Sequence, residues 1–173
     1  MTELEEEFIH FRLCIDRLNS AWLILNAVKS NSGNPLAGPA FRYALVEYST
    51  SYRLSRGQVN KKGWKLGTSF IPPEFLGLHN RILDSRDQTH AHTDLTVLEP
   101  RPYFTAIDGE HKIRIVQNRI HGLEELTNLD SIIEMIEGTL TKMYEREPEF
   151  EKEVALINQS DPGFYRPGKR GSR

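Results

Sequence analysis

The chain has little of what would tie it to a membrane, to a disulfide scaffold or, by charge alone, to a nucleic acid. Its 173 residues include one cysteine, Cys14, so no disulfide can form within the chain and a cysteine-based zinc site lacks ligands. The longest apolar run, 21–25, is far shorter than the ~20 residues that span a bilayer. The acidic start, 1–7, is unlike a signal peptide, which begins with basic residues. We therefore expect a soluble, cytoplasmic protein with no membrane partner.

The net charge is also small. A formal charge of −2 means that any grip on a polyanion has to come from a local patch rather than from the field of the whole protein. Cys14 falls within an apolar helical pattern, which predicts a buried, reduced thiol rather than a nucleophile.

Hydrophobic spacing predicts a long first helix. Large apolar side chains recur at alternating steps of four and three residues, which places them on one stripe of a helix of about 26 residues. These residues are Leu4, Phe8, Phe11, Ile15, Leu18, Trp22 and Leu25. The stripe is consistent with a core helix or with a dimer seam.

Further helices follow from the same spacing and from proline and glycine at their ends. We expect the second helix to begin at Pro39 and to end at Gly57. The third opens at Pro72-Pro73 and runs through Arg86 toward His92. A fourth covers 129–143, and a shorter helix runs from Pro148 to about Ile157.

A small β-hairpin interrupts this helical pattern. The β-prone segments 103–107 and 113–116 flank Asp108-Gly109, a strong turn signal. The sequence therefore predicts an all-α domain over residues 1–159, a bundle of four to five helices with a hairpin appendage near 103–116. Residues 160–173 form a Pro/Gly-rich basic tail that we expect to be flexible.

The segment 51–73 is the most basic part of the predicted folded region. It has no Asp or Glu, and aromatic side chains, Trp64 and Phe70, stand among its cations. Basic charge beside aromatic rings is typical of surfaces that bind single-stranded nucleic acid. The alternative is a solvated loop with an aromatic residue in the core. The predicted RNA-binding residues are Arg53, Arg56, Lys61, Lys62 and Lys65.

The stretch 84–94 gathers the residue types of a metal-free RNA-cleaving site. It holds Arg86, followed by Asp87, and two histidines, His90 and His92. A guanidinium is a permanent cation that suits a phosphate, and histidine accepts and returns a proton near neutral pH. A histidine can take the proton of a ribose 2′-hydroxyl, whose oxygen then attacks the adjacent phosphorus while Arg86 stabilises the developing charge. The expected product is a 2′,3′-cyclic phosphate.

Spacing leaves the working histidine open. On one straight helix Arg86 and His92 lie about 120° apart, whereas Arg86 and His90 lie about 40° apart. Either His90 is the partner of Arg86, or the helix ends before His92, or the site pairs residues from two subunits.

Two other interpretations of this stretch remain. The charged residues around Asp84 can form a surface lattice while the histidines cap the C-terminus of the helix. Alternatively His90, His92 and Asp94, with His79, hold zinc, which needs three or four ligands. The H-x-H motif of barrel hydrolases, however, belongs to a fold for which this chain is too short.

The segment 86–94, Arg-Asp-Gln-Thr-His-Ala-His-Thr-Asp, resembles the R-x(4–6)-H motif of the HEPN superfamily. It is closest to the version R-D-x-x-x-A-H-x-D of abortive-infection-type bacterial members. The segment 41–48 and Leu78-His79 are similar in character, and the match covers roughly 36–98.

The resemblance implies a helical bundle that dimerises, with the motifs of two subunits forming one cleft. Many such proteins are metal-independent endoribonucleases that act as toxins or phage-defence effectors. Carried over, Arg86 is the motif arginine, Asp87 the polar residue after it and His92 the motif histidine, and Glu47 is a helper from the second helix. His90 is an extra imidazole at a position where the family has no fixed residue.

We therefore expect a homodimeric endoribonuclease that needs no metal or cofactor, with RNA as its substrate and an antitoxin or another defence protein as its partner. The alternatives are a non-catalytic helical interaction module, a nucleotide-binding module and a metallohydrolase.

Overall fold

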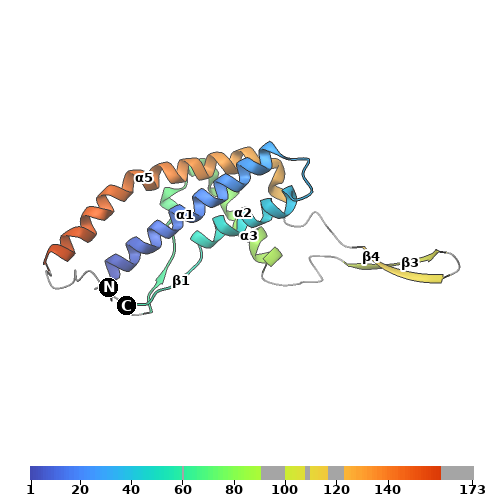
Figure 1. Ribbon diagram of the computed structural model, residues 1–173, viewed down its shortest axis with the longest axis horizontal. Helices are drawn as coiled ribbons and strands as arrows, with labels where there is room; N and C mark the ends of the chain where they lie inside the picture. The colour runs from blue at the N-terminus through green and yellow to red at the C-terminus, as the bar shows by residue number, and fades with distance from the viewer. Residues whose placement is uncertain (60, 91–99, 108–109, 117–122, 161–173) are drawn as a thin grey trace, which may run out of the picture.

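The computed structural model of the chain describes residues 1–59, 61–90, 100–107, 110–116 and 123–160. This part of the chain is mostly helical, and a two-stranded hairpin extends away from the helices (Figure 1). The main elements are α1 (Glu3–Ser30), α2 (Ala37–Ser51), β1 (Ser55–Arg56), β2 (Gly63–Trp64), α3 (Leu76–His90), β3 (Arg101–Ile107), β4 (Glu110–Val116) and α5 (Leu129–Ser160). Short 3₁₀ turns, η1 (Thr68–Phe70), η2 (Pro73–Phe75) and η3 (Glu124–Asn128), connect them.

The predicted first helix is confirmed. Thr2 and Glu5 form a capping box that satisfies the first free N–H groups of α1. The predicted stripe faces the core: Leu18 and Leu25 have no exposed surface, and Cys14 is buried beside them. Because α1 packs against both α2 and α5, the stripe is a core face within one chain. Burial raises the pKa of the Cys14 thiol to about 11, so it is an unreactive core group, as predicted.

The second helix ends earlier than predicted. It stops at Ser51, and the backbone N–H of Leu66 bonds to the Ser51 carbonyl at 2.8 Å as the chain returns from β1 and β2. Gly57 lies beyond the end of α2, in the segment by which the chain returns. A Cβ at Gly57 would meet the Lys62 carbonyl oxygen at 2.5 Å and a Glu6 carboxylate oxygen at 2.6 Å. The glycine is needed for this close approach.

The third helix and the hairpin form where predicted. Proline occupies the first turn before α3, and the helix is described through His90. Strands β3 and β4 pair antiparallel, from Arg101 opposite Val116 to Ile107 opposite Glu110. The predicted turn, Asp108-Gly109, and the predicted tail beyond Ser160 lie outside the described residues.

The last two predicted helices are one. α5 is 32 residues long and continues through Pro148, although a proline within a helix removes a hydrogen bond and costs about 3 kcal/mol. Contacts on both sides of the proline offset this cost. The ring of Phe150 packs edge-on against the ring of Phe8, with 5.3 Å between the ring centroids. The Arg146 guanidinium donates a hydrogen bond to Glu153 at 2.9 Å, which connects the helix on either side of the proline. Figure 1 shows α5 bending along its length.

In the described part of the chain, no helix combines the length and the apolar character that crossing a bilayer requires.

The first turns of α1 fix the β1–β2 segment. Glu6 is buried, and its carboxylate accepts hydrogen bonds from the backbone N–H groups of Gln58 and Val59 and from the indole of Trp64 at 3.1 Å. Burial raises the pKa of Glu6, but these three donors outweigh it and hold the pKa below the ordinary value.

We expect Glu6→Gln to destabilise the protein at neutral pH and to matter less in acid. Because the pKa of Glu6 is lowered in the folded state, its contribution is present above the unfolded pKa of 4.5 and is lost as pH falls through the folded pKa. Urea unfolding at about pH 7 and about pH 3 measures the difference between wild type and variant. A difference that stays the same at both pH values would contradict this account.

Candidate functional site

The predicted motif arginine lies at the edge of the hydrophobic core. α3 turns its inner face toward α2 through His79 and Ile82, which are 2% and 0% exposed. Arg86 follows His79 by seven residues, so it lies on nearly the same stripe, about 20° away. Its side chain is half-buried. The inner face of α3 therefore ends in a partly enclosed guanidinium.

The described part of α3 includes some, but not all, of the residues predicted to act with Arg86. Asp87 and His90 belong to the described backbone of α3, and position 90 lies one turn beyond position 86. The predicted continuation of the helix through Arg86 is confirmed. His92 and Asp94 lie outside the described residues.

A buried cluster of two tyrosines and a histidine fixes α3 on α2. The Tyr48 hydroxyl lies 2.8 Å from Nδ1 of His79 and 3.4 Å from Sδ of Met135 on α5. The ring of Tyr52 meets the His79 ring edge-on at 4.5 Å. The hydroxyl therefore bonds to a side-chain atom on each of two neighbouring helices. A single contact point thus joins three helices.

The cluster is electrically neutral. Burial lowers the pKa of His79, which favours the uncharged imidazole, and raises the pKa of Tyr48 and of Tyr52. Because all three side chains are enclosed, we assign the cluster to positioning α3 rather than to chemistry on a substrate.

A second contact holds α3 from its other side. Arg81 donates two hydrogen bonds to the buried Glu125 of η3, at 2.7 and 3.2 Å. Asn128 donates a third, at 2.7 Å. The hydrogen bonds from Arg81 are the largest cause of the lowered pKa of Glu125, against the effect of burial. This forked pair fixes the rotation of α3 and hence the direction in which Arg86 leaves it.

Glu47 is held by other partners within the chain. Its carboxylate lies 3.7 Å from the guanidinium of Arg17 on α1. It also accepts a hydrogen bond from Tyr43, which raises the pKa of that tyrosine. Within the described residues, these partners place Glu47 on the α1 side of α2, and the structure does not bring it to Arg86.

The predicted RNA-binding residues have different surroundings. Arg53 is half-buried, whereas Arg56, Lys61 and Lys65 are exposed. Lys62 forms an ion pair with Glu3 at 3.3 Å and lies over the Trp64 ring at 4.3 Å.

Trp64 itself is 8% exposed and donates its indole N–H to Glu6. The alternative of a loop with its aromatic residue in the core therefore describes Trp64, and this ring is not available to stack on a base.

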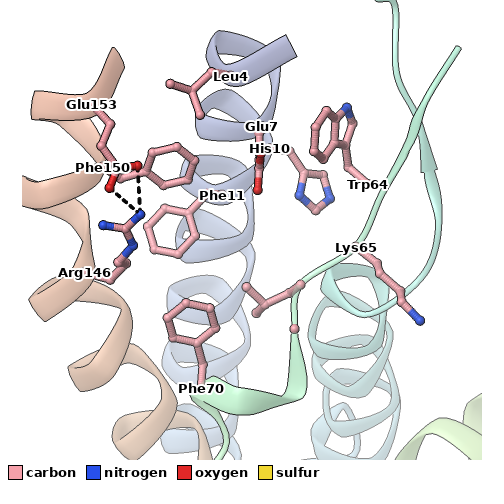
Figure 2. Close-up of a pocket in the computed structure, with 12 residues that line it drawn as sticks. Leu4, Glu7, His10, Phe11, Trp64, Lys65, Phe70, Arg146, Phe150 and Glu153 are labelled. Carbon is pink, nitrogen blue, oxygen red and sulfur yellow. Dashed lines mark hydrogen bonds and ion pairs between the residues drawn. The ribbon is translucent and has the colours of Figure 1, made fainter. Parts of the chain in front are cut away.

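A pocket of about 320 Å³ opens between the first half of α1, the second half of α5 and the segment that joins β2 to η1 (Figure 2). Phe11, Phe70 and Phe150 form much of its wall, and Arg146 is already held by Glu153. Of the predicted site residues in the described part of the chain, Lys65 alone borders it, and Figure 2 shows this side chain directed away. The pocket is thus separate from the motif on α3.

Metal binding was one interpretation of the histidines. Among the residues that the structure describes, no three His, Cys, Asp or Glu side chains come together as metal ligands. The proposed ligands His92 and Asp94 lie outside these residues.

Sequence reasoning missed the contacts that position the site. Tyr48 and His79 lie at core-facing positions of two separate helices, and the periodic pattern of each helix does not show that their polar atoms meet. The pair of Arg81 and Glu125 joins distant segments and leaves no local signal. The seven-residue interval from His79 to Arg86 is the one available indication that the motif arginine shares the core-facing stripe.

Tyr48→Phe tests the positioning cluster. The variant leaves Nδ1 of His79 without its hydroxyl partner in a buried site, and we expect the free energy of unfolding to fall by about 1–3 kcal/mol. Urea denaturation measures it. Tyr43→Phe removes an exposed hydroxyl from the same helix and should leave stability nearly unchanged. Equal stability of Tyr48→Phe and wild type would show that the cluster does not fix α3.

Comparisons with family models, with curated proteins and with solved structures found no match to this chain. Its function is therefore argued from the arrangement of its own residues.

Proposed function

We propose that the chain is a metal-independent endoribonuclease of the HEPN type, acting as a homodimer in a toxin or phage-defence system. The observation that carries the proposal is the placement of Arg86. It ends the core-facing stripe of α3, half-buried, on a helix held by His79 on one side and by Arg81 on the other. A partly desolvated guanidinium on a fixed helix suits the charge that develops on a phosphoryl group.

In this proposal His92 takes the proton from the ribose 2′-hydroxyl. The 2′-oxygen then forms a bond to the adjacent phosphorus while the bond to the 5′-oxygen breaks. Arg86 stabilises the charge on the non-bridging oxygens, and the leaving 5′-oxygen receives a proton from the histidine. The products are a 2′,3′-cyclic phosphate and a 5′-hydroxyl, so the step needs neither metal nor cofactor.

The other predicted residues have supporting functions. Asp87 orients the guanidinium or the imidazole, and His90 is the alternative base, one turn from Arg86 on the same helix. Because Glu47 is engaged by Arg17, we propose that any help from it is indirect. Arg53, Arg56, Lys61 and Lys65 guide RNA by charge, whereas Lys62 is partly neutralised by Glu3.

A shared cleft requires two copies of the chain. The hairpin β3–β4 supports association because it exposes large apolar side chains: Phe104, Ile113 and Ile115 are 66–72% exposed. An isolated two-stranded hairpin is only marginally stable in water, so packing this apolar face against another chain would stabilise it. The same observation favours the second candidate function, a non-catalytic interaction module.

The RNase proposal is tested by digesting RNA in EDTA. We expect wild type to cut and Arg86→Ala and His92→Ala to be about 10²–10⁴-fold slower, since each loses a group that acts in the transition state. His90→Ala in the same assay shows which imidazole works. Arg12→Ala and His10→Ala, on α1, are the matched controls and should retain activity.

Circular dichroism and sedimentation confirm that each variant stays folded and associated. RNA left intact by wild type, or cut equally by wild type and both motif variants, would refute the proposal. Activity that EDTA removes would instead support the metallohydrolase.

A further inference from the structure

The hairpin β3–β4 has two chemically distinct faces. In an antiparallel pair, side chains alternate between the faces and directly opposed residues share one. One face holds Phe104 opposite Ile113, next to Pro102 opposite Ile115. The other face carries the cations: it holds Arg101 opposite Val116, Tyr103 opposite Arg114, Thr105 opposite Lys112 and, at the turn end, Ile107 opposite Glu110.

The cationic face differs in charge from the whole chain. Its strands carry three cations, Arg101, Lys112 and Arg114, against one acid, Glu110, which stands at the turn end. The sum is +2, whereas the chain as a whole is −2. All three cations are exposed, and Tyr103 beside them is 60% exposed.

Several cations of the helical part form ion pairs, whereas two arginines of the hairpin form none within the described residues. Carboxylates from neighbouring helices pair with Arg12, Arg17 and Lys29, and Arg146 pairs with Glu153 of its own helix. In the described part of the chain, neither Arg101 nor Arg114 has an ion-pair partner. Exposed arginines without ion-pair partners favour an anionic partner, because binding them releases that partner's counterions.

We propose that the cationic face of the β3–β4 hairpin binds single-stranded RNA. Arg101, Lys112 and Arg114 contact successive phosphates, and Tyr103 stacks on a base between them. Residues two apart on one strand lie about 7 Å from each other, so the cations form a row rather than a single point. A row of cations with an interleaved aromatic ring is the arrangement that holds a flexible strand without sequence preference.

The choice of RNA among polyanions rests on the proposed function, but the contact does not depend on cleavage. The hairpin follows the motif segment along the chain, so it provides a second point of attachment for the same substrate. A single strand that meets both places gains affinity because the second contact is intramolecular.

The test uses a fluorescent single-stranded 2′-O-methyl oligouridylate, which lacks the nucleophile and therefore reports binding alone. Anisotropy titrations at roughly 50 and 200 mM salt compare wild type with R101Q/K112Q/R114Q. We expect about tenfold weaker binding or more, and a salt slope smaller by about 2, because each single-strand phosphate contact contributes about 0.7. R12Q/K29Q/K152Q makes the same change in net charge on the helices and should bind within about threefold of wild type.

A conservative variant separates charge from folding of the hairpin. R101K/R114K retains both charges and should keep most of the affinity and the salt slope. The proposal is overturned if R101Q/K112Q/R114Q binds as tightly as wild type, if the helix variant loses as much, or if wild type does not bind the oligonucleotide. It is likewise overturned if the hairpin proves to bind only an acidic protein.

The two proposals fail separately. Cleavage of natural RNA by wild type together with unchanged binding by R101Q/K112Q/R114Q would overturn the hairpin contact and leave the nuclease. Hairpin-dependent binding without any cleavage would overturn the nuclease and leave the contact.

Discussion

The position of α3 depends on one buried contact, the hydrogen bond between the Tyr48 hydroxyl and the imidazole of His79. Around it α2, α3 and α5 meet, since Met135 lies against the same hydroxyl. The contact is uncharged and enclosed, so it fixes geometry without taking part in proton transfer at a substrate. Two turns further along the same stripe, Arg86 emerges at the edge of the core. The hydrophobic core thus determines where the motif arginine stands.

The cations of the molecule differ in whether they form ion pairs. Some cations are neutralised by ion pairs between elements and attract RNA less. Examples are Arg81 with Glu125 and Lys62 with Glu3. The segment expected to be the main RNA-binding surface lies against the acidic first turns of α1 and is tied there by Glu6. On the hairpin, two exposed arginines, Arg101 and Arg114, have no ion-pair partner within the described residues. Sequence composition identified basic stretches, but it could not show which cations meet carboxylates.

Periodic patterns predicted the elements well, and contacts between distant segments account for the errors. The stripe of α1, the proline start of α3 and the hairpin are local signals, and each is found where expected. Pro148 predicted a break, but Phe150 and the α1 side chains it meets stabilise a continuous helix. Gly57 predicted a helix end, but the glycine is needed for its close approach to Glu6. Glu6 lies far away in the sequence and leaves no local signal. For the site, spacing placed Arg86 on the third helix but did not reveal the contacts that hold this helix.

The central claim is that Arg86 of one subunit and a histidine of another form one cleft. Mixing Arg86→Ala subunits with His92→Ala subunits tests it most directly, after exchange of subunits is verified by native mass spectrometry. If the cleft is shared, each mixed dimer regains one intact pair, and a random mixture should recover about a quarter of wild-type RNA cleavage. A mixture that forms mixed dimers yet stays as inactive as either variant alone would contradict the shared cleft.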